Sequence, residues 1–272
     1  QTINLSGIGD GDADADQAIT VTATSNNTSL IPNPTVTYTS DNATGSLAYT
    51  PVSDINGTAV ITVTVTDNGG TANSGVNAKS ITFTVTETAV NDEPSFTKGP
   101  DITVLEDSGS SSTSSWASNL SKGASNESSQ TLTFSVSNNN NSLFSSQPAI
   151  NSSGTLTFTT ASNQNGSATV TVGLSDDGGV ANGGDNTYAD QTFTITVTAV
   201  NDVVTLTSAI ADYPVLEDAA ATTVIDLDDV FDDIDILNGD PTALQTLTYS
   251  VVSNSNSGLA TPSIDGNGVL TV

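Results

Sequence analysis

Hydrophobic and polar residues alternate along several stretches of the chain. In residues 60–66, the apolar Ile61 and Val63 alternate with threonines, and residues 82–86 and 192–197 repeat this pattern. A period of two, carried by β-branched residues, predicts half-buried β-strands. The turn sequences DNGG, DDGG, NSSG and DGNG separate such segments, and no long helical pattern competes with them. The pattern therefore predicts an antiparallel β-sandwich.

Several sequence blocks recur at a spacing of about 110 residues. NGTAVITVTVTDNGG (from Asn56) returns as NGSATVTVGLSDDGG (from Asn165), TAVND begins at Thr88 and Thr198, and VLED begins at Val104 and Val215. A fixed period of this kind is typical of repeat architectures. It predicts an all-β chain of tandem Greek-key β-sandwich domains of about 110 residues, placed end to end. The predicted repeats are 1–93, 94–203 and 204–272.

The repeat frame is incomplete at both ends of the sequence. The first repeat lacks the VLED-bearing first strand, and the third stops at Val272, before its NGT and TAVND blocks. A sandwich without several of its strands exposes its core and its unpaired edges. Two readings stay open, an excerpt from a longer repeat array or missing strands supplied by a neighbouring chain.

The composition excludes several classes of partner. The formal net charge is −27, with three lysines and no arginine or histidine, so little is available to neutralise a nucleic acid or an anionic membrane surface. No apolar run reaches the roughly 20 residues of a membrane-inserted helix. Cysteine is absent, so a metal or contacts between adjacent repeats would have to support small domains. Together with abundant Thr, Ser, Asn and Gly, this composition favours an exported, extracellular bacterial protein.

An enzyme is not expected from this composition. Without histidine and cysteine, the commonest general base and the thiolate nucleophile are missing. Paired carboxylates could cleave glycosides, but here the acidic residues recur with the repeat, whereas a catalytic pair usually occurs once. They favour a structural role that is performed in every repeat.

Acidic residues gather at predicted strand ends and at the junctions between repeats. AVNDEP (89–94) and AVND (199–202) follow the last strands of the first two repeats, VLED comes soon after, and TDNGG and SDDGG begin long loops. Calcium takes about six to eight oxygen ligands from carboxylates, amides and backbone carbonyls. These segments could supply such a set of ligands.

The order VTVTDNGG then ITFTVTETAVNDEP, matched by VTVGLSDDGG then TFTITVTAVND, resembles the bacterial cadherin-like repeats of giant surface adhesins. The resemblance covers essentially the whole chain, and it implies calcium clamped between domains. The implied ligands are Asn91, Asp92, Glu106 and Asp176 at the first junction, and Asn201, Asp202 and Glu217 at the second. Asp107 and Asp218, beside the two glutamates, and the strand-end Asp67 are candidates on the same ground. AVNDVV lacks the proline of AVNDEP, and a metal-free turn with Asx capping stays open as the alternative.

A second acidic cluster lies before the strand that begins with glutamine. The first repeat has Asp10, Asp12, Asp14 and Asp16 there, and the third has Asp226, Asp228, Asp229, Asp232, Asp233, Asp235 and Asp240. The second repeat has KGASNESSQ instead, with Lys122 in the loop. Alternating aspartates resemble the start of an EF-hand loop, but no glutamate stands at the twelfth loop position after Asp10. Calcium binding and a solvated acidic loop both remain open.

These features favour structural extender repeats of a bacterial cell-surface adhesin, stiffened by calcium at the junctions between repeats. One alternative is a carbohydrate- or cell-binding module with extracellular polysaccharide or homophilic contacts as partners. Trp116 and Tyr188 could touch a sugar ring, although lone aromatic residues form no platform. The other alternative is a subunit of an extracellular filament or surface layer, assembled by strand complementation. Ice binding by the threonine-rich faces would need a flat array, which twisted sandwiches rarely offer.

Overall fold

The computed structural model describes residues 1–11, 17–237 and 246–272. These residues form two compact units, one of residues 1–95, 121–132 and 175–188, and one of residues 96–120, 133–174 and 189–272. The predicted boundaries at 93 and 203 follow the sequence repeat and stay predictions. In the described part of the chain, no helix has the length and hydrophobicity that a membrane span requires.

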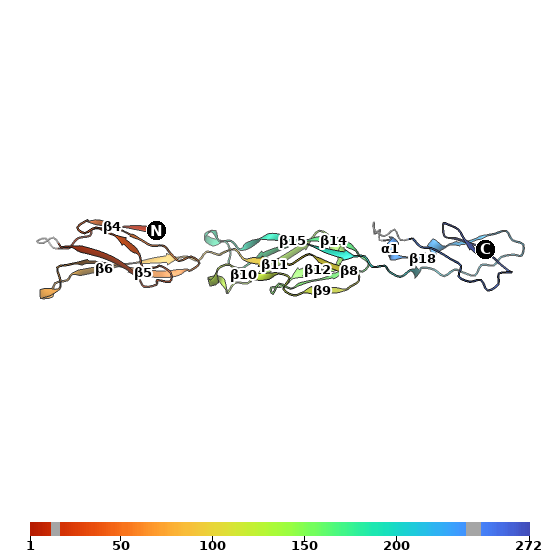
Figure 1. The fold of residues 1–272 in the computed structure, drawn as a ribbon, viewed down its shortest axis with the longest axis horizontal. Coiled ribbons are helices and arrows are strands. Elements are labelled where there is room, and N and C mark those ends of the chain that lie inside the picture. Colours follow the sequence, from red (N-terminus) through yellow and green to blue (C-terminus); the bar gives the residue numbers. More distant parts are fainter. Residues whose placement is uncertain (12–16, 238–245) are drawn as a thin grey trace. The chain divides into compact units, whose positions relative to one another are not determined.

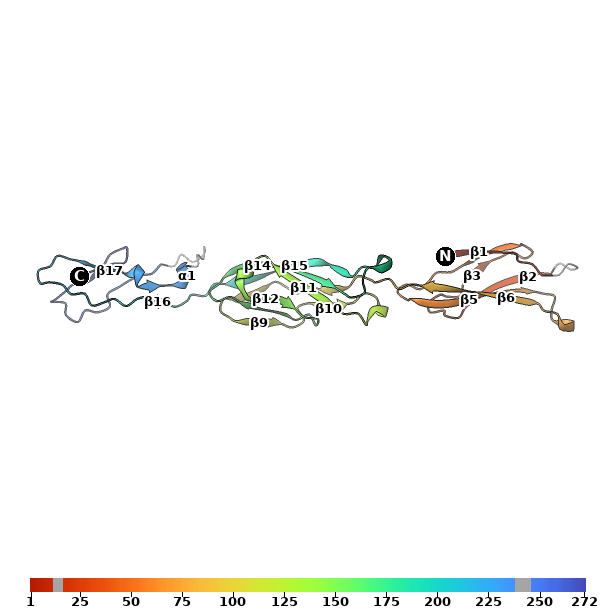
Figure 2. The same ribbon diagram turned by 180° about the vertical axis from the view of Figure 1, so that it is seen from behind.

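Two three-stranded sheets form the sandwich of the first repeat. One has the order β1-β4-β3 and the other β2-β5-β6, and Figure 2 shows β1 and β3 on one side with β2, β5 and β6 on the other. All their pairings are antiparallel. The bounds are β1 (Thr2–Ser6), β2 (Ile19–Ser25), β3 (Thr35–Thr37), β4 (Thr44–Ala48), β5 (Gly57–Asp67), η1 (Ala72–Ser74) and β6 (Ala78–Glu87).

The alternating residues of β5 account for the core of this sandwich. Ile61 and Val63 are 0% and 3% exposed, whereas the threonine between them is only half-buried. The other buried apolar residues of the cluster are Ile19, Val21, Leu30, Ile31, Leu47, Ala59 and Val85. The period-two prediction is confirmed over residues 59–63, where Ala59, Ile61 and Val63 are buried and the residues between them are not.

The second repeat is also a two-layer sandwich. Its sheets have the orders β11-β14-β15-β8 and β12-β13-β9, with a short β10-β7 pair, and Figure 1 shows β14 and β15 in one layer with β9 and β12 in the other. The bounds are β7 (Ser95–Thr97), β8 (Ile102–Leu105), β9 (Ser110–Thr113), β10 (Ser118–Ser121), η2 (Ser125–Glu127), β11 (Thr133–Asn138), η3 (Asn141–Leu143), β12 (Phe144–Ile150), β13 (Leu156–Thr160), β14 (Gly166–Ser175), η4 (Ala181–Gly183) and β15 (Thr187–Thr198). Phe193, Ile195 and Val197 are buried as predicted. The all-β sandwich fold is confirmed by these sheets.

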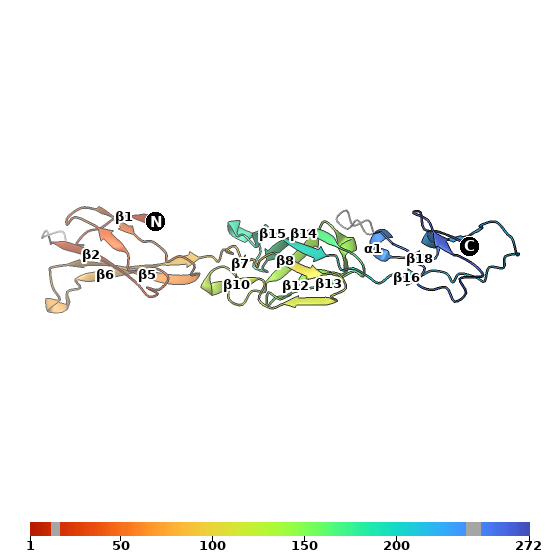
Figure 3. The ribbon, with the colours of Figure 1, turned by 45° about the vertical axis from the view of Figure 1, so that its right-hand side comes forward.

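The pairing of β8 with β15 departs from the antiparallel pattern that the sequence predicted. β8 pairs in parallel with β15, with Ile102 opposite Ile195 and Leu105 opposite Thr198, and Figure 3 shows the two strands side by side. Turn residues predict hairpins between neighbouring segments. They carry no information on pairing between strands far apart in the sequence, such as β8 and β15. This parallel pair brings the end of β8 to the point where the linker to the third repeat begins.

The third repeat forms shorter strands. β16 (Thr205–Leu206) pairs with β18 (Phe231–Asp232), and β17 (Thr223–Asp226), β19 (Ser263–Ile264) and β20 (Val269–Thr271) form a sheet of order β17-β20-β19. The short helices are η5 (Leu227–Asp229) and α1 (Ile234–Leu237). Residues 246–252 form no strand, although they repeat the sequence of β11. β11 is held by β14, and residues 204–272 contain no counterpart of β14.

Candidate metal centre

Three carboxylates converge where the second repeat meets the third. Glu106, Asp202 and Asp235 each place one carboxylate oxygen within 4.8 Å of the others. Glu106 follows β8, Asp202 lies in the linker, and Asp235 belongs to α1. Glu106 is only 2% exposed and Asp235 9% exposed. Oxygen ligands at this spacing suit a hard cation such as Ca²⁺.

The parallel pairing of β8 puts Glu106 in this cluster. The Glu106 backbone N–H donates to the Thr198 carbonyl oxygen (2.9 Å), and the Val200 N–H donates to Glu106 Oε1 (2.6 Å). The other carboxylate oxygen, Oε2, is buried and has no hydrogen-bond partner. A buried carboxylate oxygen without a partner is costly, and a bound cation would satisfy it.

This position corrects the grouping that the sequence analysis made. Glu106 was assigned to the first junction with Asn91 and Asp92, but the structure places it beside Asp202. The reason is topological, because β8 runs parallel to β15, the last strand of the repeat, and therefore ends at the same end of the domain. The glutamate of VLED therefore lies at the junction that follows its own repeat.

Asp202 and Asp235 are linked through the backbone. The Asp202 N–H donates to Asp235 Oδ2 (2.7 Å), and the Asp235 N–H donates to Asp233 Oδ1 (3.1 Å). Burial raises the pKa of Asp202, and the nearby carboxylates of Asp235, Asp107 and Asp233 raise this pKa further. A raised carboxyl pKa shows that negative charge is disfavoured at this point. In the sequence, Asp235 is recognisable only as one of several aspartates in an acidic segment. Its proximity to the linker arises from folding and has no signature in the sequence.

Asn163 and Asp107 border the same cluster. With its amide nitrogen turned inward, Asn163 donates to Asp107 Oδ2 (3.2 Å) and to Asp202 Oδ2 (3.3 Å). The Asn163 backbone N–H also donates to Asp107 Oδ1 (3.1 Å). With the amide turned the other way, its oxygen would face the carboxylate oxygens, an arrangement that is favourable only with a cation between them. Asn163 is a potential ligand that the sequence did not reveal, because it lies in a segment without acidic residues.

The first linker is held by an amide clamp. Asn91 is 9% exposed, and its Nδ2 donates to Asp176 Oδ1 (3.0 Å) and to the Asp185 carbonyl (2.6 Å). Its Oδ1 accepts from Gln130 Nε2 (2.5 Å). The structure thus brings Asn91 and Asp176 together, as the sequence analysis grouped them, and joins them directly. Asp176 Oδ2 is buried and has no hydrogen-bond partner.

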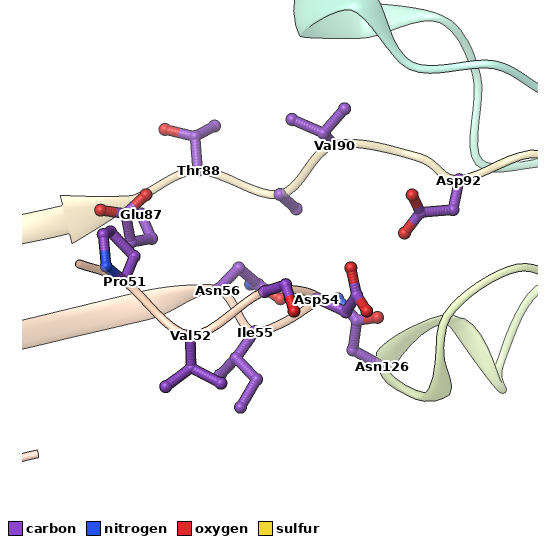
Figure 4. Close-up of a pocket in the computed structure, with 12 residues that line it drawn as sticks. Pro51, Val52, Asp54, Ile55, Asn56, Glu87, Thr88, Val90, Asp92 and Asn126 are labelled. Atoms are coloured by element: carbon purple, nitrogen blue, oxygen red, sulfur yellow. Dashed lines mark hydrogen bonds between the residues drawn. The ribbon is translucent and has the colours of Figure 1, made fainter. Parts of the chain in front are cut away.

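Asp92 faces a small polar cavity next to this clamp. The cavity has a volume of about 270 Å³ and is lined by Asp54, Glu87, Asp92 and Asn126 among others. Figure 4 shows the Asp92 carboxylate turned toward Asp54 and Asn126. Burial raises the pKa of Asp92, followed by the charges of Glu127 and Asp54. As in the second linker, the linker aspartate sits among like charges.

The two linkers share one backbone contact. The Asp92 N–H donates to Glu127 Oε1 (2.9 Å), just as the Asp202 N–H donates to Asp235. The second oxygen of Glu127 accepts from the Ala124 N–H (2.9 Å). In each linker, a carboxylate on a short helix of the following repeat therefore accepts a hydrogen bond from the backbone of the aspartate. Glu127 and Asp235 stand in unrelated loop sequences, which is why the repeat pattern did not reveal their equivalence.

The remaining candidates lie apart from these clusters. Asp67 Oδ1 accepts from the Gly69 N–H (2.8 Å), and Asp10 Oδ2 accepts from the Gln17 N–H (3.1 Å). Asn201 Nδ2 donates to the Asp202 carbonyl (2.8 Å). Glu217 and Asp218 are exposed and are absent from the described acid cluster. Asp12, Asp14 and Asp16 lie outside the described residues.

Trp116 has a packing role in the structure. It is 2% exposed, its Nε1 donates to the Pro100 carbonyl (2.9 Å), and its ring lies 4.2 Å from that of Phe193. A buried indole with a satisfied N–H belongs to the core and offers no face to a sugar.

Comparison with known proteins returns similar structures only. No protein-family model and no curated protein matches the chain. Domains 4 and 5 of the S-layer protein SbsC are 17% identical with a TM-score of 0.28, and the match covers 66% of this chain and 70% of that one. Chicken VE-cadherin EC1-2 is 15% identical with a TM-score of 0.31, over 73% of this chain and 92% of that one.

The human desmocollin-1 ectodomain is 16% identical with a TM-score of 0.36; the match covers 70% of this chain but only 36% of that ectodomain. The strand order and the buried core, rather than these similarities, identify the fold as a β-sandwich.

Proposed function

We propose that this chain consists of extracellular structural repeats of a bacterial surface adhesin, and that calcium bound at the junctions stiffens it. The buried Glu106 Oε2, which has no hydrogen-bond partner and lies beside Asp202 and Asp235, carries the proposal. A cation would compensate this buried oxygen, because the neighbouring carboxylates cannot donate hydrogen bonds to it when they are ionised. The composition supports a non-catalytic role, since histidine and cysteine are absent.

The donor set fits calcium better than a transition metal. Glu106, Asp202, Asp235 and Asp107 offer carboxylate oxygens, and Asn163 offers an amide oxygen. Hard oxygen ligands in this number favour Ca²⁺, whereas zinc and copper sites use histidine or cysteine, which this chain lacks. When bound, calcium would supply positive charge between the linker and both adjoining repeats.

The first linker offers a smaller version of the same arrangement. Asp92 and Asp54 face the polar cavity, with Glu127 close enough to raise the Asp92 pKa. Asp54 occupies the position of Asn163 in the repeat. We expect calcium there to bind with fewer protein ligands than at the second linker.

The test is calcium titration of the 272-residue chain, followed by calorimetry and by thermal unfolding. Sites of extracellular modules have dissociation constants of about 10⁻⁴–10⁻³ M. At tenfold excess over such a constant, calcium should stabilise the folded state by about 1.4 kcal/mol. Glu106→Gln keeps the size of the side chain but removes one charge, and should weaken binding about tenfold.

Glu217→Gln is the matched control for this experiment. It makes the same change in the same V-L-E-D motif. Glu217, however, is exposed and does not belong to the acidic cluster found among the described residues. Calcium should bind to this variant as to the parent chain. Equal calcium affinity of the parent chain and Glu106→Gln, or an unfolding temperature that calcium does not change, would refute the proposal.

A further inference from the structure

The chain contains ten Asn-X-Ser/Thr tripeptides in which X is not proline. This tripeptide is the acceptor sequence for N-linked glycosylation, which needs an accessible asparagine on the protein surface. A chain rich in Asn, Ser and Thr produces such tripeptides by chance, so the structure has to decide which of them can react. Their asparagines are Asn4, Asn26, Asn27, Asn42, Asn56, Asn119, Asn126, Asn140, Asn151 and Asn165.

Exposure separates two of these tripeptides from the other eight. All three residues are exposed in 42–44 and in 151–153, whereas each of the others contains a half-buried or buried residue. The amide nitrogen can also be used by the fold, as in Asn140, whose Nδ2 donates to the Ser167 carbonyl (3.3 Å). Residues 42–44 and 151–153 are therefore the accessible acceptor sequences.

The two exposed tripeptides occupy the same position of the repeat. They are about 110 residues apart, and each is followed by the leucine that enters the core, Leu47 in one repeat and Leu156 in the other. Both leucines are 0% exposed. Asn42 lies in the turn between β3 and β4, and Asn151 lies in the turn between β12 and β13. The recurrence places an acceptor sequence on the same turn of two sandwiches.

The turn after β12 holds the Asn151 side chain by its oxygen alone. Asn151 Oδ1 accepts from the Ser153 N–H (3.0 Å), from Ser153 Oγ (2.7 Å) and from the Thr155 N–H (3.0 Å). Asn151 is exposed, and its Nδ2 has no hydrogen-bond partner among the described residues. A carboxamide nitrogen carries two N–H donors, and here both are left to the solvent.

The third repeat indicates that this turn needs only the oxygen. Asp265 stands at the position of Asn151, and its Oδ1 accepts from the Asn267 N–H (2.8 Å) and the Val269 N–H (3.0 Å). Both turns also close with a backbone hydrogen bond from the fourth residue to the first. Because an aspartate forms the same turn, the amide nitrogen of Asn151 is not required by the fold.

We propose that Asn151 is an N-glycosylation acceptor and that Asn42 is the equivalent acceptor in the first repeat. In the transfer, Nδ2 bonds to the anomeric carbon of a sugar diphosphate, the bond from that carbon to the diphosphate oxygen breaks, and the diphosphate leaves. The amide proton passes to a base of the transferase. The three donors at Asn151 Oδ1 stabilise the negative charge that builds on this oxygen as Nδ2 loses its proton. This inference rests on the proposed function, since N-linked sugars belong to secreted proteins.

The test is glycopeptide mass spectrometry of the natural protein, isolated from the surface of the cells that make it. Sugar should be found on Asn151 and Asn42, while Asn140, whose amide nitrogen donates within the fold, should be bare. A single sugar residue would identify a nucleotide diphosphate as the leaving group. A preassembled oligosaccharide would identify a lipid diphosphate.

Asn151→Asp, produced in the same cells, separates modification from the structural role of this residue. It removes Nδ2 but keeps the oxygen that the turn uses, so it should fold like the parent chain and lose all sugar at this site. Ser153→Ala should also abolish the modification. Ser152→Ala is the control, because it keeps the acceptor sequence and should be modified like the parent chain.

An unmodified Asn151 in the surface protein would overturn this inference, and so would equal modification of Asn140. Neither result would affect the proposed calcium sites, because calcium titration of the unmodified chain tests those separately.

Discussion

At the scale of single residues, identical motifs have different surroundings. Glu106 and Glu217 both stand in V-L-E-D, yet Glu106 is buried beside two other carboxylates and Glu217 is exposed. The difference comes from the strand partner, since β8 pairs with β15 and residues 215–218 pair with nothing in the described part of the chain. The burial of each glutamate therefore depends on whether the strand that precedes it has a hydrogen-bonded strand partner.

Asp202 gives a prediction about pH. Burial, and then the charge of Asp235, raise its pKa in the folded chain. A carboxyl group whose pKa is higher in the folded state binds protons more tightly there. In calcium-free buffer the ionised group therefore destabilises the fold at neutral pH. This effect is relieved as the pH falls through the raised pKa toward the ordinary value of 3.8.

Asp202→Asn should reveal this contribution in thermal unfolding without calcium. At pH 7 the variant should unfold at a higher temperature than the parent chain, and the difference should shrink as the pH falls toward the ordinary carboxyl value of 3.8. With calcium at pH 7 the order should reverse, because the variant loses a ligand charge. A variant less stable than the parent at pH 7 without calcium would contradict the assigned pKa direction.

At the scale of elements, loops rather than strands hold the first linker. The loops 121–132 and 175–188 group with residues 1–95 in one compact unit, and both supply partners to Asn91 or Asp92. The backbone of the second loop approaches closely enough that a Cβ added at Gly178 would overlap Asn91 Oδ1. Glycine at this position is thus required by packing against the linker.

Gly178→Ala tests this close approach. The added methyl group must displace the Asn91 side chain or the loop, which should destabilise the chain by about 1–3 kcal/mol. Chemical denaturation at matched calcium concentration measures the change. Gly266→Ala serves as the control, since a Cβ there meets nothing within 4 Å. Equal stability of the two variants would show that the linker is not clamped by this loop.

At the scale of the whole molecule, charge and repetition act together. The net charge of −27 favours expansion through self-repulsion. After burial, neighbouring carboxylates contribute to the raised pKa of both Asp92 and Asp202. Calcium at the junctions would neutralise charge where the chain changes from one repeat to the next. Under the proposed function, ion binding at the junctions would make the chain more resistant to bending.

Small-angle scattering measures this effect on the 272-residue chain. Under the proposed function, calcium should increase the apparent stiffness and the maximum dimension of the particle, at a protein concentration low enough to keep it monomeric. Sodium at equal ionic strength should not reproduce the change, because general screening acts on all exposed charges alike. Scattering curves that are the same with calcium and with a chelator would contradict calcium-dependent stiffening.

The sequence by itself determined the fold class and several members of the candidate site. Alternation of β-branched residues and recurrence of whole blocks are local or periodic signals. They identified the strands carrying Ile61 and Phe193, and they marked Asn91, Asp92 and Asp202 as residues placed at junctions. They marked Asp176 as a strand-end residue, and only the resemblance assigned it to the first junction.

Only the tertiary structure decided which acids meet. The parallel pairing between β8 and β15, which are far apart in the sequence, leaves no local signature, so the junction at which Glu106 lies could not be deduced from its motif. Asp235, Glu127 and Asn163 stand in sequences that do not repeat or are not acidic, and folding alone brings them to the linkers. Burial and distance set the electrostatics of these groups, and both are properties of the folded chain.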